Sequence, residues 1–448
     1  MRADPDSIAA IATPAGAGGV GVLRVSGPAA PAIARTLLGF MPQPRHAHYA
    51  AFLGADGAPI ERGLALYFAA PASYTGEAVL ELHAHGSPVV LDLLLRRVLE
   101  LGARHARPGE FTERAFLNGK LDLAQAEAVA DLIAARSESA ARAAQRALAG
   151  AFSQRVHGLV AALTALRVQV EAAIDFADEE LELLGDPALA AGLATVRDAV
   201  ALLIADARHG VRLARGARAV LIGRPNTGKS SLLNALAGED RAIVTATPGT
   251  TRDALHVELV IDGVGVELID TAGLRDSADA IEQEGVRRAR AALARCDLAV
   301  LVSETAHVEA DLALLDGLPG RAAALVVVNK CDLLADPAAR VETRAGRTWL
   351  HLSARTGAGL DELRAELARH AGAGSEEHAF TARQRHVEAL QQAASALAAA
   401  AAALAAQRSP ELIAEDLRQA AQTLGTITGA VSADDLLGAI FAGFCIGK

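Results

Sequence analysis

Cysteine and aromatic residues are scarce in this 448-residue sequence. The three cysteines, Cys296, Cys331 and Cys445, are odd in number and form no CxxC pair. A disulfide framework or a zinc site is therefore not expected, and the composition fits the reducing cytosol. Aromatic residues make up only 3% of the chain, so the apolar content rests on Ala, Leu and Val, which favours helix-rich packing.

The sequence also lacks an excess of basic residues, a signal segment and a long apolar run. The net charge of −10 argues against a general nucleic-acid coat protein, although a local basic patch is compatible with it. No charged segment followed by an apolar one stands at the N-terminus, so no secretory signal is expected. The longest apolar run, 393–406, is almost all alanine and is shorter than the roughly 20 strongly apolar residues of a membrane span. We therefore expect a cytoplasmic protein without a membrane segment.

The length suggests about three domains, and the order of predicted elements divides the chain into four segments. Residues 1–118 combine Gly/Pro turns with short apolar runs. They predict a small α/β domain with strands at 20–25, 64–68 and 79–83 and a helix at 89–101. Residues 119–215 and 372–448 have apolar residues at helical spacing and few helix breakers, which predicts long helices.

Strands and helices alternate in residues 216–371, which predicts a separate α/β domain. Strands are expected at 219–222, 257–261, 264–269, 298–302, 325–328 and 349–352. Four of these six runs are continuously apolar, as in parallel strands buried on both faces. Asp262-Gly263 is a hairpin-turn signal between the second and third strands.

Helical segments on both sides of this α/β domain indicate that it is inserted into a helical domain, because compact domains often have neighbouring termini. Two unrelated helical domains are the alternative. The predicted fold class is thus multidomain: an N-terminal α/β domain, a discontinuous helical domain and an inserted Ras-like phosphate-loop domain with a mostly parallel sheet.

A phosphate loop opens the inserted domain. Gly223-Arg-Pro-Asn-Thr-Gly228-Lys229-Ser230 follows a predicted strand and precedes a predicted helix, as this motif requires. Glycines let backbone amides approach the phosphates, Lys229 supplies positive charge, and the Ser230 hydroxyl can ligate Mg²⁺.

Further motifs specify a guanine nucleotide. Asp270-Thr-Ala-Gly273 follows a predicted strand. In this position Asp270 can hold Mg²⁺ through water, and the backbone amide of Gly273 can reach the γ-phosphate. Asp332, in Asn-Lys-Cys-Asp, can accept from the guanine N1 and N2 hydrogens, a donor pair that adenine lacks. The amide of Ala354 can donate to guanine O6, and Thr251 stands where a switch threonine would ligate Mg²⁺.

One position departs from ordinary switch GTPases. Leu274 follows Gly273 and cannot orient a water molecule as glutamine would. Glu282, in the acidic stretch 276–284, is the best carboxylate for this work. A solvated acidic loop is the equally weighted alternative.

Two patterns in the first segment resemble binding sites, but a structural interpretation is favoured for each. Gly16-Ala-Gly-Gly-Val-Gly21 matches GxGxxG but precedes a strand instead of opening a helix, so a turn is the better interpretation than a dinucleotide site. Glu81, His83 and His85 alternate along a strand and share one face. A polar strand face is favoured over a metal site.

The chain ends on Phe444-Cys-Ile-Gly-Lys448, although chain termini are usually polar and frayed. We therefore expect this tail to dock against folded protein. It is no CaaX box, because the cysteine stands fourth from the end with lysine last.

These features resemble the bacterial tRNA-modification GTPase family MnmE, also called TrmE, over essentially the whole chain. The most specific matches are 21–27, the run 108–127, the phosphate loop, 249–253 and the Cys-Ile-Gly-Lys terminus. The resemblance implies an N-terminal folate-binding and dimerisation domain at 1–118 and helical segments at 119–215 and 372–448. It places the GTPase domain at 216–371.

The resemblance also implies partners and a reaction. Members form homodimers and work with an FAD-dependent partner, MnmG or GidA, in a heterotetramer or larger complex. Together they add an aminomethyl or carboxymethylaminomethyl group to carbon 5 of the wobble uridine of certain tRNAs. The one-carbon unit comes from a 5,10-methylene or 5-formyl tetrahydrofolate derivative.

Carried over residue by residue, the folate contacts fall on Arg24, Glu81, Lys120 and Lys448. A pterin ring presents a guanine-like edge to a carboxylate, which favours a ligand role for Glu81 over metal binding. Cys445 matches the family's terminal cysteine, whose role is either direct chemistry or packing.

The resemblance further implies a potassium ion that neutralises charge between the phosphates in place of an arginine finger. Its ligands would be Asn226 and the loop positions Thr245, Thr247 and Thr250; magnesium would lie on Ser230 and Thr251, and Glu282 would position the water. The full set of predicted GTP contacts is Asn226, Thr227, Gly228, Lys229, Ser230, Ser231, Thr245, Ala246, Thr247, Pro248, Gly249, Thr250, Thr251, Asp270, Thr271, Ala272, Gly273, Asn329, Lys330, Asp332, Ser353, Ala354 and Arg355.

An alternative function is a GTP-switch assembly factor whose helices bind a protein or ribosomal particle. The nucleotide motifs alone fit both functions, and the first segment and the tail distinguish them.

Overall fold

A computed structural model describes residues 6–175, 187–239, 256–270, 293, 296–315, 323–334, 338–373, 379–406, 409–431 and 434–447. The chain separates into two compact units. The first consists of Met1–Ala130, Phe152–Val196 and Gln392–Lys448, and the second of Asp131–Ala151 and Arg197–Gln391. Residues of the second unit lie between segments of the first, as an insertion requires, but the second unit also includes helical residues on both sides of the predicted inserted domain. The domain boundaries at 118, 215 and 371 stay predictions.

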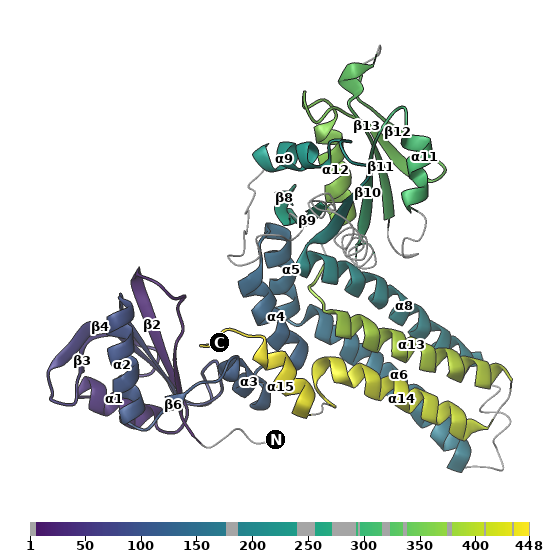
Figure 1. The fold of residues 1–448 in the computed structure, drawn as a ribbon. Coiled ribbons are helices and arrows are strands. Elements are labelled where there is room, and N and C mark those ends of the chain that lie inside the picture. The colour runs from purple at the N-terminus through teal and green to yellow at the C-terminus, as the bar shows by residue number, and fades with distance from the viewer. Residues whose placement is uncertain are drawn as a thin grey trace, which may run out of the picture. The chain divides into compact units, whose positions relative to one another are not determined.

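A six-stranded sheet of order β3-β4-β5-β2-β1-β6 forms the N-terminal part of the first unit (Figure 1). Its pairs are antiparallel except the parallel pair β1–β6. The strands are β1 Ile8–Ile11, β2 Gly18–Ser26, β3 His48–Leu53, β4 Pro59–Phe68, β5 Val79–Gly86 and β6 Arg104–His105. The helices are α1 Ala30–Leu38, α2 Pro88–Glu100 and α3 Glu110–Leu117.

Alternation along β2 and β5 divides the sheet into two faces. Leu23, Val25, Leu80 and Leu82 are fully buried in the core that α1 and α2 complete. The residues between them, including Arg24 and Glu81, project from the opposite face. There, Phe111 of α3 packs with Ile8 and Ala10 of β1 in a smaller cluster.

The glycine run at 16–21 is not the turn that we predicted, except at its start. Gly16 has a φ of 118°, but β2 already begins at Gly18, with an irregular register between Gly18 and Gly21. At Gly21, a Cβ atom would lie 2.5 Å from Leu91 Cδ1 of α2. The glycine therefore lets the helix approach the strand closely.

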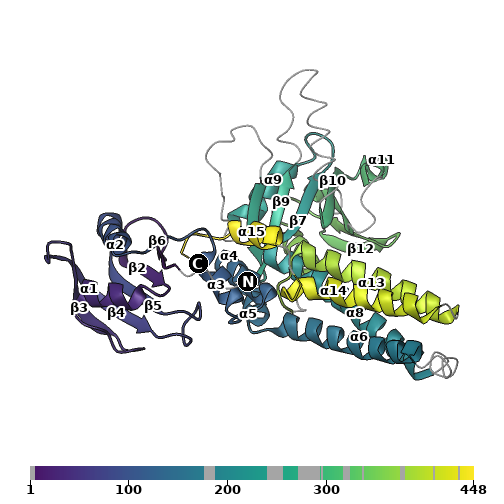
Figure 2. The ribbon, with the colours of Figure 1, turned by 90° about the horizontal axis from the view of Figure 1, so that it is seen from below.

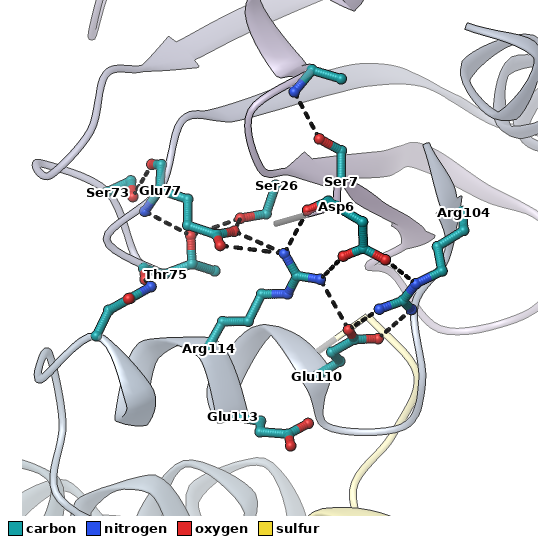
Figure 3. A network of polar contacts seen from close by, with 12 residues as sticks. Asp6, Ser7, Ser26, Ser73, Thr75, Glu77, Arg104, Glu110, Glu113 and Arg114 are labelled. Carbon is teal, nitrogen blue, oxygen red and sulfur yellow. Dashed lines mark hydrogen bonds and ion pairs between the residues drawn. The ribbon is translucent and has the colours of Figure 1, made fainter. Parts of the chain in front are cut away.

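A buried ionic network joins α3 to the start of β1 (Figure 3). The Arg114 guanidinium donates to Asp6 Oδ1 at 2.6 Å, to Glu110 Oε1 at 3.0 Å and to Glu77 Oε1 at 3.2 Å. Arg104 also contacts Asp6 and Glu110. Arg114 is 2% exposed and Glu110 is 1% exposed, so their charges rely on one another for compensation.

The second unit contains a seven-stranded sheet of order β12-β13-β11-β10-β7-β9-β8. The five central strands are parallel, whereas β8 and β12 pair antiparallel at the edges. The strands are β7 Ala217–Ile222, β8 His256–Ile261, β9 Val264–Asp270, β10 Leu298–Glu304, β11 Ala323–Asn329, β12 Arg340–Arg344 and β13 Arg347–His351. All six predicted strands are present, and Asp262-Gly263 forms the expected turn with positive φ at both residues.

Both faces of this sheet are buried, as the continuous apolar runs predicted. One face packs with α9 Lys229–Glu239 and α12 Leu360–Ala371. The other packs with α11 Val308–Asp311 and the short helix Leu312–Leu315. The polar edge strand β12 was not predicted, because its sequence, Arg-Val-Glu-Thr-Arg, has only one apolar residue.

Long helices make up the remainder. They are α4 Leu123–Ala134, α5 Glu138–Leu148, α6 Ala151–Asp175, α8 Pro187–Arg215, α13 Gln384–Ala405, α14 Pro410–Thr428 and α15 Asp434–Ala442. In the first unit, α6 and α14 run alongside the C-terminal part of α13 (Figures 1 and 2).

By length and composition alone, three of these helices could cross a membrane: α6, α8 and α13. The alanine-rich run lies in α13, a helix of 22 residues that is long and apolar enough, so the expectation that this segment is too short is wrong for the helix as a whole. Alanine accounts for much of the apolar character of α13, and Leu390, Ala393, Leu397 and Ala400 are fully buried in the protein.

Candidate functional site

The loop after β7 has the backbone geometry of a phosphate loop. Gly223, Asn226 and Gly228 have φ angles of 148°, 62° and 93°. A Cβ at Gly223 would lie 2.1 Å from Val302 O, and one at Gly228 would lie 2.2 Å from Asn329 Nδ2. Both glycines are therefore required by space as well as by conformation.

Charged and hydroxyl groups converge on this loop because β7 and β9 are parallel neighbours whose carboxyl ends meet at one edge. Lys229 is 4% exposed, and its Nζ donates to Gly223 O at 3.0 Å and to Arg224 O at 2.7 Å. Ser230 Oγ donates to Asp270 Oδ2 at 2.9 Å. These two oxygen donors fit a hard cation such as Mg²⁺ beside the phosphates.

The base-recognition residues assemble at the ends of β11 and β13. Asn329 Nδ2 donates to Thr227 O at 2.9 Å, and the Ala354 amide donates to Asn329 Oδ1 at 3.0 Å. Ser353 Oγ and Arg355 Nη2 both donate to Asp332, each at 2.6 Å. These contacts, first that of Ser353, lower the pKa of the Asp332 carboxyl, so it is a charged acceptor at neutral pH.

Lys330 connects these two halves of the site. Its Nζ donates to Asn226 O at 2.9 Å and to Glu304 Oε1 at 2.5 Å. The predicted contacts Asn226 to Ser231, Asp270, Asn329, Lys330, Asp332 and Ser353 to Arg355 thus lie along one edge of one sheet. The predictions for Thr245 to Thr251, Thr271 to Gly273, Leu274 and Glu282 lie outside the described residues.

A second cluster lies on the face of the N-terminal sheet that is opposite α1 and α2. Arg24 and Glu81 are directly paired across β2 and β5, and Arg24 Nε donates to Glu81 Oε1 at 2.8 Å. The Arg24 guanidinium lies 5.7 Å from the ring centroid of Tyr74 and 5.6 Å from that of Phe111. A charged pair flanked by aromatic rings suits a flat heterocycle with polar edges.

The C-terminal tail docks beside this pair, as its apolar sequence predicted. Arg24 Nη1 donates to Gly447 O at 3.4 Å, and the Gly109 amide donates to Cys445 O at 3.4 Å. Phe444 is buried in a cluster with Phe441 and Leu123. Cys445 itself is an exposed free thiol, and Lys448 lies outside the described residues.

The buried network also contacts the loop between β4 and β5, which contains Ser73, Thr75 and Glu77 (Figure 3). Glu77 accepts from Ser26 Oγ at 2.7 Å as well as from Arg114, and Tyr74 Oη is 2.9 Å from Thr112 Oγ1 of α3. Lys120 Nζ donates to Pro71 O at 3.2 Å, in the same loop. Sequence reasoning missed Tyr74 and Phe111, because neither stands in a periodic or charged pattern.

The histidines on β5 have carboxylate neighbours. His83 Nε2 is 3.5 Å from Glu81 Oε2, and His85 Nδ1 is 3.0 Å from Glu61 Oε2. Within the described ranges, no group of three His, Cys, Asp or Glu side chains is arranged to hold a metal ion.

Comparisons with known proteins agree along the whole chain. A family model for the MnmE helical domain matches residues 123–445, and one for the N-terminus of the GTP-binding protein TrmE matches residues 7–120. A protein from Methylococcus capsulatus named tRNA modification GTPase MnmE is 53% identical over 446 residues, which cover 99% of each chain. Proteins of the same name from Pseudomonas aeruginosa and Xanthomonas oryzae are 52% and 54% identical and cover 100% of each chain.

Proposed function

This chain belongs to the MnmE family of tRNA modification GTPases, and from that premise we propose that it uses a reduced folate to modify a wobble uridine. GTP hydrolysis and tRNA modification follow from membership of the family. The proposal concerns the finer chemistry: addition of an aminomethyl or carboxymethylaminomethyl group to carbon 5, with a tetrahydrofolate derivative as the one-carbon donor.

The observation that carries this proposal is the Arg24–Glu81 pair beside the docked tail. The Glu81 carboxylate can accept from the pterin N–H edge, as Asp332 can from guanine. Cationic groups at Lys120, and at Lys448 in the family pattern, suit the anionic glutamate tail of a folate. Tyr74 and Phe111 supply aromatic surface next to Arg24.

In the nucleotide site, the chain's own groups bind and orient GTP. Lys229 would neutralise the terminal phosphates, and Asp332 with the Ala354 amide would select guanine. Ser230 and Thr251 would hold Mg²⁺ directly, and Asp270 would hold it through water. Mg²⁺ supplies charge neutralisation between the phosphates when it is bound. We propose Asn226 as a ligand of a potassium ion with the same effect, and Glu282 as the residue that positions water.

The remaining partners are proposals of the same kind. The chain would act as a homodimer with an FAD-dependent MnmG partner on tRNA in the cytoplasm. Ordering of the switch loops by the γ-phosphate, and their release on hydrolysis, would couple the GTPase domain to this assembly. The proposed domain limits are 1–118, 119–215, 216–371 and 372–448.

Calorimetric titration of the full chain with 5-formyl-tetrahydrofolate tests the proposal. We expect binding with a Kd in the micromolar range or below, and the same Kd with and without GDP. Absence of heat at high micromolar folate would contradict the folate proposal. It would leave the GTPase intact and favour the assembly-factor alternative, which needs no pterin pocket.

A further inference from the structure

Asp311, at the C-terminal end of α11, is a buried carboxylate outside every nucleotide motif. It is 1% exposed. Its Oδ2 accepts a hydrogen bond from Ser303 Oγ at 2.6 Å, and its Oδ1 accepts one from Arg224 Nε. Ser303 is fully buried near the end of β10. A carboxylate in such surroundings depends on its ionic partner, because an unpaired buried charge is costly.

Arg224 is the second residue of the phosphate loop, and its carbonyl group accepts two hydrogen bonds from other residues of that loop. Its carbonyl accepts from Lys229 Nζ at 2.7 Å and from Thr227 Oγ1 at 3.0 Å. Its side chain is half exposed apart from the contact with Asp311. The loop is thus held on one side by its own lysine and threonine, and on the other by α11.

The loop has little room to shift over the sheet. The preceding Gly223 lies so close to β10 that a Cβ would be 2.1 Å from Val302 O. Ser303 is the next residue along β10, and it orients Asp311. Strand β10 therefore supports the loop twice, through backbone contact at Val302 and through the chain Ser303–Asp311–Arg224.

We infer that Asp311 is a positioning residue for the phosphate loop, acting through Arg224 on the carbonyl that holds Lys229. It does not touch the nucleotide. Its ion pair fixes the position of Arg224, and with it the direction in which Lys229 and the loop amides meet the phosphates. Loss of the ion pair lowers nucleotide affinity, because Lys229 and the loop amides are then no longer preorganised to bind the phosphates.

Three variants test this inference: D311N, R224A and the double variant. We expect each single change to raise the Kd for GDP on the order of tenfold, measured with a fluorescent analogue at 20 °C. The Kd of the double variant for GDP should be no higher than that of the single variant with the higher Kd, because both changes break the same interaction. KM for GTP should rise together with the Kd for GDP. The factor by which KM rises should be larger than the factor by which kcat falls. R224K, which keeps the charge, should recover part of the affinity.

Asp297 provides the matched control, because it stands at the other end of β10 and pairs with Arg215 at 2.8 Å. D297N should lower Tm by an amount comparable to D311N while the Kd for GDP stays unchanged. The inference is overturned if D311N and R224A are folded by circular dichroism and bind GDP like the wild type. It is also overturned if the losses in the two single variants add in the double variant.

Discussion

Arg24 and Glu81 are 57 residues apart in the chain, yet they face each other across two antiparallel strands at 2.8 Å. Both side chains are 17% exposed, so their charges are partly desolvated. Each carboxylate oxygen of Glu81 has a partner within the protein, Arg24 for Oε1 and His83 for Oε2. The same guanidinium reaches the tail at Gly447. One pair therefore connects the sheet, the aromatic loop and the C-terminus.

The first prediction concerns this pair. E81Q preserves the shape of the side chain but removes the charge that would accept from the pterin edge. A hydrogen bond to a charged group contributes about 1.5–3 kcal/mol, so folate affinity should fall by about tenfold or more. Calorimetry measures this directly. E61Q is the matched control on the same sheet, since Glu61 pairs with His85 and not with Arg24. Equal folate affinity in E81Q and wild type would contradict the assigned role of Glu81.

The second prediction concerns base selection. D332N replaces an acceptor with a side chain that can also donate, and xanthine presents an oxygen where guanine presents the N2 amino group. We expect loss of GTP affinity by about tenfold or more and a gain for XTP. Competition against a fluorescent nucleotide measures both. D361N, on the exposed surface of α12, is the control. A variant that keeps its preference for GTP would rule out Asp332 as the base-selecting residue.

The third prediction concerns the buried network in the N-terminal sheet. Burial alone would raise the pKa of Glu110, but hydrogen bonds from Arg104, the Arg107 amide and Arg114 outweigh it and hold the pKa at about 2. Since the folded-state pKa lies below the usual value, the stabilisation is present above about pH 4.5 and is lost as the pH falls toward 2. It amounts to about 3 kcal/mol at neutral pH.

Denaturant unfolding of wild type and E110Q checks this prediction. The difference in free energy of unfolding should be large at pH 7 and shrink between pH 4.5 and 3. E113Q provides a contrast, because burial raises the pKa of Glu113. A raised pKa gives the opposite pH dependence: the contribution of Glu113 to stability is present below the unfolded pKa and is lost as the pH rises. A pH-independent difference for E110Q would contradict the ionised state of Glu110.

The fourth prediction concerns potassium. Replacement of K⁺ by Na⁺ should collapse GTP turnover and change GDP affinity by less than about twofold, because the ion is proposed to neutralise charge that develops between the phosphates. Initial rates in matched chloride salts measure this. Equal rates in the two salts would remove the potassium proposal and leave the proposed magnesium site at Ser230 unaffected.

The nucleotide site was predictable because its signals are local. The phosphate loop and the Asn329-Lys-Cys-Asp332 motif each follow directly on an apolar run, and parallel strands bring such segments to one edge. By contrast, Asp311 lies outside every motif and contacts the phosphate loop through Arg224. No periodic pattern in the sequence predicts this contact. Arg114 was missed for another reason: charged residues are expected at the surface, and only tertiary partners permit its burial.

The first segment was harder to interpret than the second. The family resemblance named Arg24 and Glu81, but strand register decides that they meet, and register depends on the whole sheet. The glycine run at 16–21 looked like a turn because glycine usually marks one. Here Gly21 serves close packing of a helix on a strand, which depends on Leu91 some 70 residues later.

The most direct test of the central claim is nucleoside mass spectrometry of total tRNA from cells that lack this protein. The cells are complemented with wild type, E81Q or Lys229→Ala. We predict that the 5-aminomethyl-type wobble uridine disappears in the deletion strain, returns with wild type, and stays low with either variant. Unchanged tRNA nucleosides in the deletion strain, or full restoration by E81Q, would contradict folate-dependent modification by this chain.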